Sequence, residues 1–225
     1  MSAGSCFVTG TDTGVGKTLV ASALLLGHAR RGRRAVGFKP VAAGMERRDG
    51  QWVQEDVERL AAASSVAVRP EQISPCMLRT PIAPHIAAAV EGVRIDAGRI
   101  AAAFESLRRR ADVVVAEGAG GFRVPLDEGY DTADLARALG LPVVLVVGLR
   151  LGCINHALLT AEAVAARGMR LAGWVACSIT PGMPHEAANI QALVRRLPGP
   201  LWGHVPWLAH PTAAAALPHL DEALF

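Results

Sequence analysis

The sequence predicts an α/β fold: a doubly wound, mostly parallel sheet with helices on both faces. Three observations predict it. Short apolar runs alternate with helical segments along the whole chain, and no internal repeat, linker or low-complexity stretch divides them. Several runs are apolar at nearly every position, which is typical of parallel strands covered on both sides. A glycine-rich turn joins the first run to the first helical segment, and we expect a single domain over residues 1–225.

The first apolar run, residues 5–9, leads directly into the sequence GTDTGVGKT at residues 10–18. A strand, a glycine-rich turn and Lys-Thr at the start of a helix form the context of a phosphate-binding loop. Backbone N–H groups of such a loop surround phosphate oxygens, and the helix N-terminus adds partial positive charge. Lys17 is expected to reach the β- and γ-phosphates, and the Thr18 hydroxyl to bind Mg²⁺. Thr11 departs from the usual pattern, which has Gly or Ala at this position.

The remaining elements are expected in the following order. Gly32 ends the first helix, Pro40 ends the second strand, and a loop with Gly44 and Gly50 comes next. The proline-rich segment 66–84 is expected to be irregular, with room for one short strand. The strands after the first are expected at residues 35–39, 112–117, 142–148, 171–177 and 201–205. The helices are expected at residues 17–31, 54–63, 85–91, 96–110, 132–139, 154–167 and 184–197.

The net charge and the length of the apolar runs disfavour two classes of function, nucleic-acid binding and membrane insertion. The net charge is only +3, and the arginine clusters at residues 30–34 and 108–110 lie near predicted helix ends, where cations complement the helix dipole. We therefore expect no nucleic-acid surface. The chain's longest apolar run, near residues 141–149, is too short to span a bilayer and contains Pro142, so no membrane segment is expected.

The four cysteines are scattered and form no Cys-x-x-Cys pair, which argues against a zinc site and suits a reducing compartment. The N-terminus has no charged region before an apolar stretch and therefore predicts no signal peptide. Together these features predict a soluble, cytoplasmic protein.

Four polar side chains fall where predicted strands end: Lys17 and Thr18 follow the first strand, Lys39 ends the second, and Glu117 ends the strand at 112–117. Asp56 follows Lys39 closely along the chain. Because ligands bind at the carboxyl ends of parallel strands, we expect these groups to share one site. Thr18, Asp56 and Glu117 supply the oxygen ligands that Mg²⁺ prefers.

Alternatives remain. The loop that contains Lys17 and Thr18 is also compatible with a chance match or a structural glycine turn. Glu117 is also compatible with a helix-capping or surface carboxylate, and Asp56 with an acidic residue placed in a first helical turn for its dipole. Lys39 is expected to hold a phosphoryl group or an anionic intermediate, although a lysine that merely reaches solvent would fit the same position. In the later segment 151–156, Cys153 has no base nearby in sequence, and His156 is expected to be structural.

Several motifs together resemble the dethiobiotin synthetase family of P-loop NTPases. They are GTDT-x-VGKT at residues 10–18, Lys-Pro-Val at 39–41, Glu-Gly-Ala-Gly-Gly at 117–121 and Leu-Gly-Cys-Ile-Asn-His at 151–156. The resemblance continues through 172–175 to 205–208, nearly the whole chain. It implies an ATP-dependent ligase of biotin synthesis with Mg²⁺, which carboxylates 7,8-diaminononanoate with CO₂, phosphorylates the carbamate and closes a ureido ring. The products are dethiobiotin, ADP and phosphate.

The resemblance also implies residue roles and a homodimer with its active site at the subunit interface. Lys39 and Lys17 would be catalytic, and Thr18, Asp56 and Glu117 would hold Mg²⁺. Substrate would contact Thr13, Lys39, Ala43, Gly152, Cys153 and Asn155, the last three from the neighbouring subunit. The nucleotide would contact Gly14, Val15, Gly16, Lys17, Thr18, Asp56, Glu117, Gly118, Ala119, Gly120, Cys177, Pro206, Trp207 and Leu208.

Three residues depart from the family pattern. Gly14 stands where some members have glutamate, and Ala43 replaces a serine that some members use to contact substrate. Cys177 stands where an asparagine often reads the adenine, and a thiol lacks the paired donor and acceptor of an amide. Nucleotide selectivity therefore stays open.

Two other functions compete with this interpretation. Another amide-forming ligase of cofactor biosynthesis would share the loop and the Mg²⁺ site, but not the motif at 152–156. A ParA/MinD-like ATPase switch usually has a second lysine in the loop, where this chain has Asp12, and often a basic amphipathic end. Residues 213–225 contain Pro218 and neither lysine nor arginine, which disfavours the switch.

Overall fold

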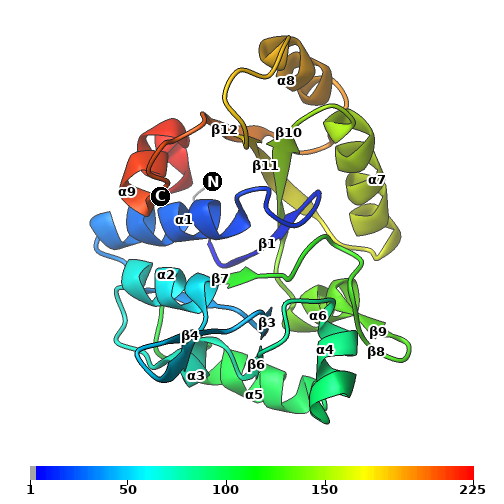
Figure 1. The fold of residues 1–225 in the computed structure, drawn as a ribbon. Coiled ribbons are helices and arrows are strands. Elements are labelled where there is room, and N and C mark those ends of the chain that lie inside the picture. The colour runs from blue at the N-terminus through cyan, green and yellow to red at the C-terminus, as the bar shows by residue number, and fades with distance from the viewer. Residues whose placement is uncertain (1–3) are drawn as a thin grey trace.

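The computed structural model describes residues 4–225 and contains a central six-stranded sheet in the order β12-β11-β10-β1-β7-β2 (Figure 1). Every neighbouring pair in this sheet is parallel. The predicted α/β class with a doubly wound parallel sheet is therefore confirmed. Its strands are β1 (Cys6–Gly10), β2 (Ala35–Phe38), β7 (Val113–Glu117), β10 (Val143–Leu149), β11 (Leu171–Ser178) and β12 (Leu201–Val205).

Helices cover both faces of the sheet (Figure 1). One face packs against α1 (Lys17–Arg30), α2 (Glu55–Ala63) and α9 (Ala213–Ala216), with the short 3₁₀ turns Leu217–His219 and Glu222–Leu224. The other face packs against α5 (Ala97–Arg108), α6 (Thr132–Leu139), α7 (Cys153–Ala166) and α8 (Glu186–Val194).

The alternation of side chains explains why the strands are apolar throughout. Along β1, Phe7 lies in the core on one face, and Cys6 and Val8 lie in the core on the other. Successive strand residues point to opposite faces, so a strand covered on both sides has no position that favours a polar residue. The single-domain expectation for residues 1–225 stays a prediction.

The predicted strands and helices are all present, and their bounds differ by one to three residues at several ends. Helix ends are set by capping geometry, and the helical spacing of apolar residues by itself locates these ends poorly. For example, Gln54, predicted as helical, is instead the N-cap of α2 and accepts a hydrogen bond from the Val57 N–H. Gly32, which follows the C-cap residue Arg31 of α1, has a positive φ of 76°, as its predicted role at the helix end requires.

The prediction of a plain loop after Pro40 is wrong. The segment contains β3 (Val41–Ala43) and an antiparallel hairpin of β4 (Glu46–Arg48) and β5 (Gln51–Val53). Asp49 and Gly50 both have positive φ, the geometry of a tight hairpin turn that Asp-Gly favours. The signal was in the sequence, but the charged residues around it hid the strand alternation.

The proline-rich segment has the one short strand expected of it. That strand, β6 (Cys76–Leu78), pairs in parallel with β3, after the short helix α3 (Pro70–Ile73). The segment ends where α4 (Pro84–Glu91) begins, with Pro84 at its first position. A further hairpin of β8 (Pro125–Asp127) and β9 (Tyr130–Asp131) was not predicted.

The strand order places a ligand site beside β1. The adjacent strands β1 and β10 are followed by connections that leave in opposite directions, toward β2 and toward β11. Ligands of open α/β sheets bind in the crevice outside the carboxyl ends of such strands. Among residues 4–225, the structure has no helix with the length and apolar character that a membrane crossing requires.

Candidate active site at the carboxyl edge of the sheet

The loop between β1 and α1 is held in shape by glycines and by one buried valine. Gly14 and Gly16 have φ of 72° and 96°, values that favour glycine. Val15 is buried, and its side chain packs closely against Gly10 and Gly148. A Cβ added to Gly10 would lie 2.5 Å from the Val15 side chain, and one added to Gly148 would lie 2.7 Å from it. The side chain of Val15 therefore anchors the loop to β1 and β10, which leaves only its backbone to meet a ligand.

Lys17, the first residue of α1, is nearly buried. Its Nζ donates a hydrogen bond of 2.8 Å to the backbone oxygen of Asp12, within the loop itself. The Asp12 carboxylate accepts a 2.7 Å hydrogen bond from the Thr13 N–H and pairs with Arg150. The ammonium of Lys17 thus lies at the centre of the loop, where an anion bound to the loop would sit.

Lys39, Asp56 and Glu117 form a charged cluster beside this loop. Lys39 follows β2, Asp56 lies in the first turn of α2, and Glu117 ends β7. The Lys39 Nζ lies 2.5 Å from Glu117 Oε1 and 2.9 Å from Asp56 Oδ2. It also lies 3.4 Å from the Gly118 backbone oxygen. The ammonium has three protons, and these three oxygens use all of them.

The Thr18 hydroxyl completes the cluster. Its Oγ1 lies 2.6 Å from Asp56 Oδ1 and 2.9 Å from Glu117 Oε1. A hydroxyl has one proton and can donate to only one of two carboxylates at a time. The oxygens of Thr18, Asp56 and Glu117 therefore lie together with fewer protons than they can accept. Such a set of oxygen ligands is what a hard cation requires.

The pKa values reflect burial and these contacts. Burial by itself lowers the pKa of Lys39, but Glu117 and Asp56 outweigh it and hold that pKa above its ordinary value. Burial raises the pKa of Glu117 against the opposing effect of Lys39. For Asp56, Lys39 and Thr18 outweigh burial, and the pKa lies below its ordinary value. Burial lowers the pKa of Lys17 to about 8, and a bound phosphate would oppose this effect.

The cluster fits a magnesium ion. The second carboxylate oxygen of Glu117, Oε2, is buried and has no hydrogen-bond partner within residues 4–225. A buried acceptor without a partner is costly unless a cation or donor satisfies it. In this described range no group of three or more His, Cys, Asp or Glu side chains is placed to hold a metal. Two carboxylates and a hydroxyl suit Mg²⁺, which usually keeps waters and binds phosphate oxygens as well.

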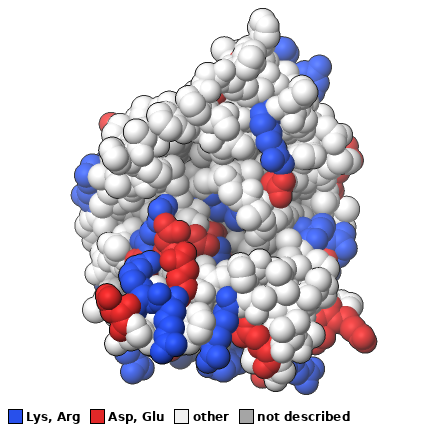
Figure 2. Space-filling model, in the orientation of Figure 1, with Lys and Arg blue, Asp and Glu red and all other residues white. Residues whose placement is uncertain are grey.

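These groups line one cavity of about 840 Å³, which lies in the hollowed middle of the face in Figure 2, bordered by charges of both signs. Predicted residues in its lining are Thr13, Gly14, Gly16, Lys17, Thr18, Lys39, Ala43, Asp56, Glu117, Ala119 and Gly120. Further lining residues were not predicted, among them Glu55 and Arg59 on α2 and the apolar wall Pro81–Pro84. Arg59 lies three residues after Asp56 on the same helix face, a spacing that would have identified it.

Other predicted site residues lie outside this lining. Gly118 is buried behind it, where a Cβ would lie 3.0 Å from Phe7. Gly152 and Asn155 are exposed, and Cys153 is buried beside Asn189. The structure therefore separates the turn at 152–155 from the cavity of its own chain, and the predicted roles of these residues stay predictions.

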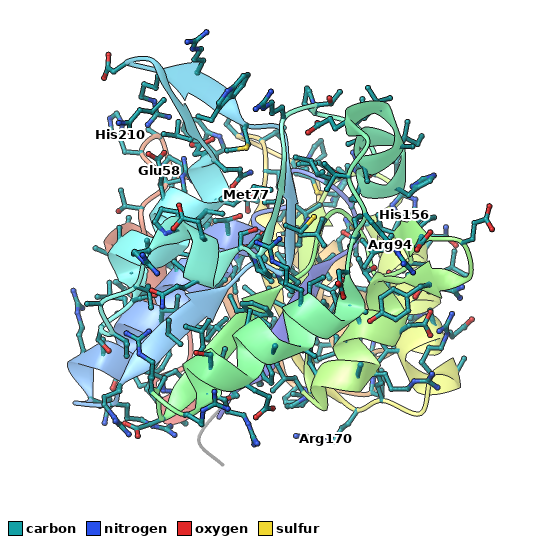
Figure 3. All side chains as sticks on the ribbon, turned by 90° about the horizontal axis from the view of Figure 1, so that it is seen from below. Glu58, Met77, Arg94, His156, Arg170 and His210 are labelled. Atoms are coloured by element: carbon teal, nitrogen blue, oxygen red, sulfur yellow. The ribbon has the colours of Figure 1, made fainter. Side chains whose placement is uncertain are left out.

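The predicted base-contacting residues lie at the ends of β11 and β12. Cys177 is buried, which raises the pKa of its thiol to about 12, and a Cβ on Gly16 would lie 3.2 Å from its Sγ. The thiol thus packs beneath the loop. Pro206 and Leu208 are partly buried and Trp207 is 48% exposed, in the loop that follows β12. Pro211 in that loop lines the cavity together with Glu55 and Arg59 of α2, and Figure 3 shows His210 and Glu58 on the same side of the molecule.

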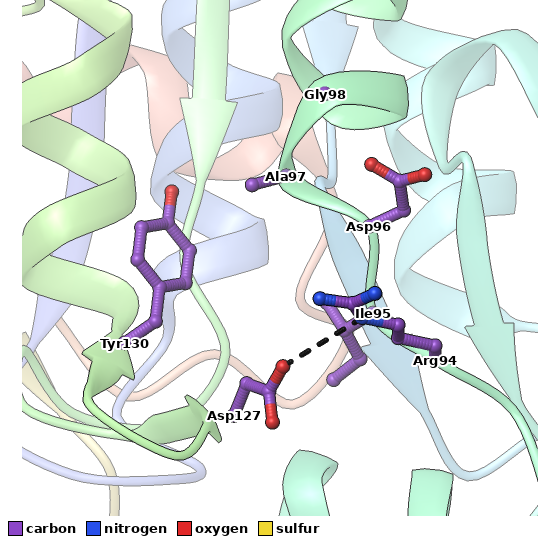
Figure 4. A pocket seen from close by; sticks show the side chains of 7 residues that line it. All are labelled: Arg94, Ile95, Asp96, Ala97, Gly98, Asp127 and Tyr130. Atoms are coloured by element: carbon purple, nitrogen blue, oxygen red, sulfur yellow. Dashed lines mark ion pairs between the residues drawn. The ribbon is translucent and has the colours of Figure 1, made fainter.

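A smaller cavity of about 360 Å³ lies between β8, β9 and the start of α5 (Figure 4). Arg94 and Asp127 face each other across it at 3.9 Å, with Tyr130 at its side. None of the described residues that line it belongs to the predicted site. The larger cavity is therefore the candidate active site.

Comparison with known proteins identifies the family. A family model described as an AAA domain matches residues 5–215. The ATP-dependent dethiobiotin synthetase BioD of Aromatoleum aromaticum (strain DSM 19018 / LMG 30748 / EbN1) is 61% identical over 203 residues, which is 90% of each chain.

Two solved structures share the fold. The signal recognition particle receptor FtsY from Elizabethkingia anophelis, in complex with GDP, has a TM-score of 0.59 at 14% identity. The match covers 100% of this chain and 62% of the FtsY chain. MinD from Pyrococcus horikoshii OT3, complexed with Mg-ADP, has a TM-score of 0.55 at 15% identity, over 99% of this chain and 88% of that one. At such identities the likeness concerns the fold alone. The fold and the 61% identity lead to one conclusion: the chain belongs to the dethiobiotin synthetase family.

Proposed function

We propose that this chain is an ATP-dependent dethiobiotin synthetase, a ligase of biotin synthesis that uses ATP and Mg²⁺. The observation that carries the proposal is the convergence of Lys39, Thr18, Asp56 and Glu117 beside the phosphate loop. This set can hold a metal-bound triphosphate and, next to it, an anionic acceptor of the phosphoryl group.

The nucleotide would bind with its phosphates against the loop 10–18. Backbone N–H groups and the N-terminus of α1 would surround the phosphate oxygens, and Lys17 would leave the Asp12 oxygen to bridge them. Thr18, Asp56 and Glu117 would hold Mg²⁺, which would neutralise charge on the triphosphate. A residue buried like Lys17 contributes strongly here because little water screens its charge.

The second substrates are 7,8-diaminononanoate and CO₂. One amine attacks CO₂ to form a carbamate and releases a proton. A carbamate oxygen then attacks the γ-phosphorus, and the bond to the bridging oxygen of ADP breaks. The second amine attacks the carbonyl carbon of this mixed anhydride and displaces phosphate, which closes the ring. No enzyme nucleophile is needed, so the chain acts through positioning and charge neutralisation.

Lys39 is placed to stabilise the carbamate and its phosphorylated form. Its ammonium stays charged because two carboxylates hold it, and it must turn one proton toward substrate when the site fills. The wall of the cavity beyond it is apolar, with Ala43, Ile82 and Val124, and suits the methylene chain of the diamino acid.

We also propose a homodimer in which the neighbouring subunit presents Gly152, Cys153 and Asn155 to the carboxylate tail of the substrate. Asn155 is exposed and lies outside the cavity of its own chain. The side chains of Leu151 and Leu159, near it, are 98% and 56% exposed. Apolar side chains this exposed beside a polar group support an interface with another copy. All four cysteines are free, which supports a cytoplasmic location.

Asn155→Ala tests the role across the interface. We expect the KM for the diamine to rise roughly tenfold, because the charged carboxylate loses a hydrogen bond from the Asn155 amide, while the affinity for ATP is retained. Steady-state kinetics with each substrate varied in turn measures both. An unchanged KM for the diamine would remove Asn155 from the substrate site.

The decisive experiment measures phosphate release from Mg·ATP with bicarbonate, with and without the diamine, and the mass of the product. We expect release that depends on the diamine, and a product heavier by one carbonyl and lighter by two hydrogens. ATP turnover indifferent to the diamine would instead favour another ligase substrate. No turnover with any nucleotide would contradict the assignment of the phosphate loop.

A further inference from the structure

The phosphate loop contains a carboxylate, Asp12, which is paired with Arg150 across a sequence separation of 138 residues. Asp12 lies between β1 and α1, and Arg150 directly follows β10, the strand adjacent to β1. The pair therefore ties the loop to the turn that leads into α7. A second contact ties the loop to β10 itself, since the Gly148 N–H donates to Thr11 Oγ1 at 3.4 Å.

Asp12 makes contacts that determine the shape of the loop. One carboxylate oxygen accepts the Thr13 N–H at 2.7 Å, and the other accepts from the guanidinium of Arg150. Its backbone oxygen accepts from Lys17 at 2.8 Å. With the Thr13 N–H engaged by a side chain, that group cannot turn into the loop, so the contact decides which backbone donors face a ligand.

The charge of Asp12 presents a problem for anion binding. Asp12 lines the same cavity as Lys17 and Thr13, and its carboxylate is 47% exposed. A negative charge beside a bound triphosphate repels it, and little screening occurs at such short range. The Thr13 N–H and Arg150 together lower the pKa of Asp12, so the carboxylate stays ionised at neutral pH and the repulsion is not removed by protonation.

We propose that Arg150 is a positioning residue for nucleotide binding: its guanidinium neutralises Asp12 and holds that carboxylate on the Thr13 N–H, so that the loop accepts a triphosphate. The inference rests on the proposed nucleotide site and adds to it a residue that directly follows β10. A simple role in stability would not require the pair to lie at the cavity, since exposed ion pairs contribute little to folding.

The test measures the dissociation constant of Mg·ATP by titration calorimetry for the wild type, Arg150→Met and the double variant Asp12→Asn/Arg150→Met. We expect Arg150→Met to weaken binding roughly fivefold, the scale of one partly exposed charge pair. The double variant is expected to recover most of the affinity, because the carboxylate that needed Arg150 is gone. Arg150→Lys, which restores a cation, is expected to lie near the wild type.

Arg34→Met is the matched control. It removes the same side chain from an Arg–Asp pair of similar exposure, formed with Asp112 at the opposite edge of the sheet. We expect it to leave the affinity for Mg·ATP unchanged. In steady-state kinetics Arg150→Met is expected to raise the KM for ATP and to leave the KM for the diamine near the wild-type value, a split that general loosening of the fold would not produce.

Equal affinities of the wild type and Arg150→Met would overturn the proposal and leave the nucleotide site intact. A double variant that binds as weakly as Arg150→Met would also overturn it, because the loss would then not come from the unneutralised carboxylate. A wild type that fails to bind Mg·ATP would overturn the proposed function itself. Thermal unfolding of each variant keeps loss of folding separate from loss of binding.

Discussion

Ion pairs lie at both ends of the central sheet, and their side chains differ in solvent exposure. At the carboxyl edge the side chains of Lys39 and Glu117 are only 5% and 1% exposed and lie 2.5 Å apart. At the amino edge Arg34 and Asp112, which precede β2 and β7, lie 2.7 Å apart with side chains 63% and 40% exposed.

This difference in exposure indicates which of the two ion pairs has a function beyond stability. The amino-edge pair keeps most of its hydration, so forming it costs and gains little. The carboxyl-edge cluster holds charges where burial disfavours them, and replacing a buried ion pair with apolar residues often leaves stability unchanged or higher. Charges retained under such conditions are typical of sites that bind or react.

Lys39→Ala breaks the buried cluster and has the largest expected effect. We expect ring closure to fall by roughly 10²–10³-fold or more, because the carbamate and its phosphorylated form lose their counter-charge. The affinity for Mg·ATP is expected to change little. Product formation and calorimetric ATP binding measure the two quantities separately, and an equal collapse of ATP affinity would assign Lys39 to the nucleotide instead.

His28 offers a buried titratable group far from the cluster, at the end of α1. It is 1% exposed, its ring meets Phe225 edge-on, and its Nδ1 has no hydrogen-bond partner among the described residues. Burial, with a smaller effect of Arg33, lowers its pKa to about 4.

This lowered pKa predicts a pH dependence of stability. As the pH falls from about 6.5 to about 4, His28 becomes protonated in the unfolded chain but stays neutral in the folded protein. The free energy of unfolding therefore falls by about 3 kcal/mol over this range. His28→Leu is expected to remove that part of the slope in urea titrations at several pH values. Parallel pH profiles for the two proteins would show that His28 is not the group responsible.

Thr18→Val tests whether the oxygens of the cluster hold a metal. The substitution keeps the shape of the side chain and removes the hydroxyl that both Asp56 and Glu117 contact. We expect the Mg²⁺ concentration for half-maximal turnover to rise roughly tenfold, the scale for losing one supporting oxygen. Turnover by the wild type is expected to stop on addition of EDTA and to return with Mg²⁺. An unchanged Mg²⁺ requirement in the variant would place the ion elsewhere.

Arg34→Met has the smallest expected effect and completes the comparison. Because both partners at the amino edge are solvated, we expect a slight decrease in Tm and no change in turnover. Differential scanning calorimetry and the phosphate-release assay check the two. A loss of activity here would mean that the two edges of the sheet are coupled, and that the solvated pair at the amino edge also contributes to function.

The sequence predicted the elements well where local chemistry is strong. The apolar runs of the six sheet strands, the glycine turn before Lys17 and the stop at Gly32 are each local signals. It failed after Pro40, where the hairpin of β4 and β5 is exposed on both faces and the alternation of apolar and polar residues that marks a strand is absent.

The candidate site was predictable only in part. Lys17 and Thr18 lie in a motif, and Arg59 shares a helix face with Asp56, but the wall at Pro81–Pro84 carries no signal until the start of α4 is seen to line the same cavity. The pairing of Asp12 with Arg150 was likewise invisible, since nothing in either segment specifies its partner.

The fold class, the phosphate loop and the chemistry available to the site could all be predicted from the sequence. Periodicity and glycine placement act over a few residues, so a linear reading captures them. The sequence predicted that Thr18 and Glu117 share a site, but their contact of 2.9 Å across 99 residues and the exposure of Asn155 outside the cavity of its own chain were seen only in the tertiary structure. Such meetings depend on strand order, and strand order follows from how all the helices bury their apolar faces at once.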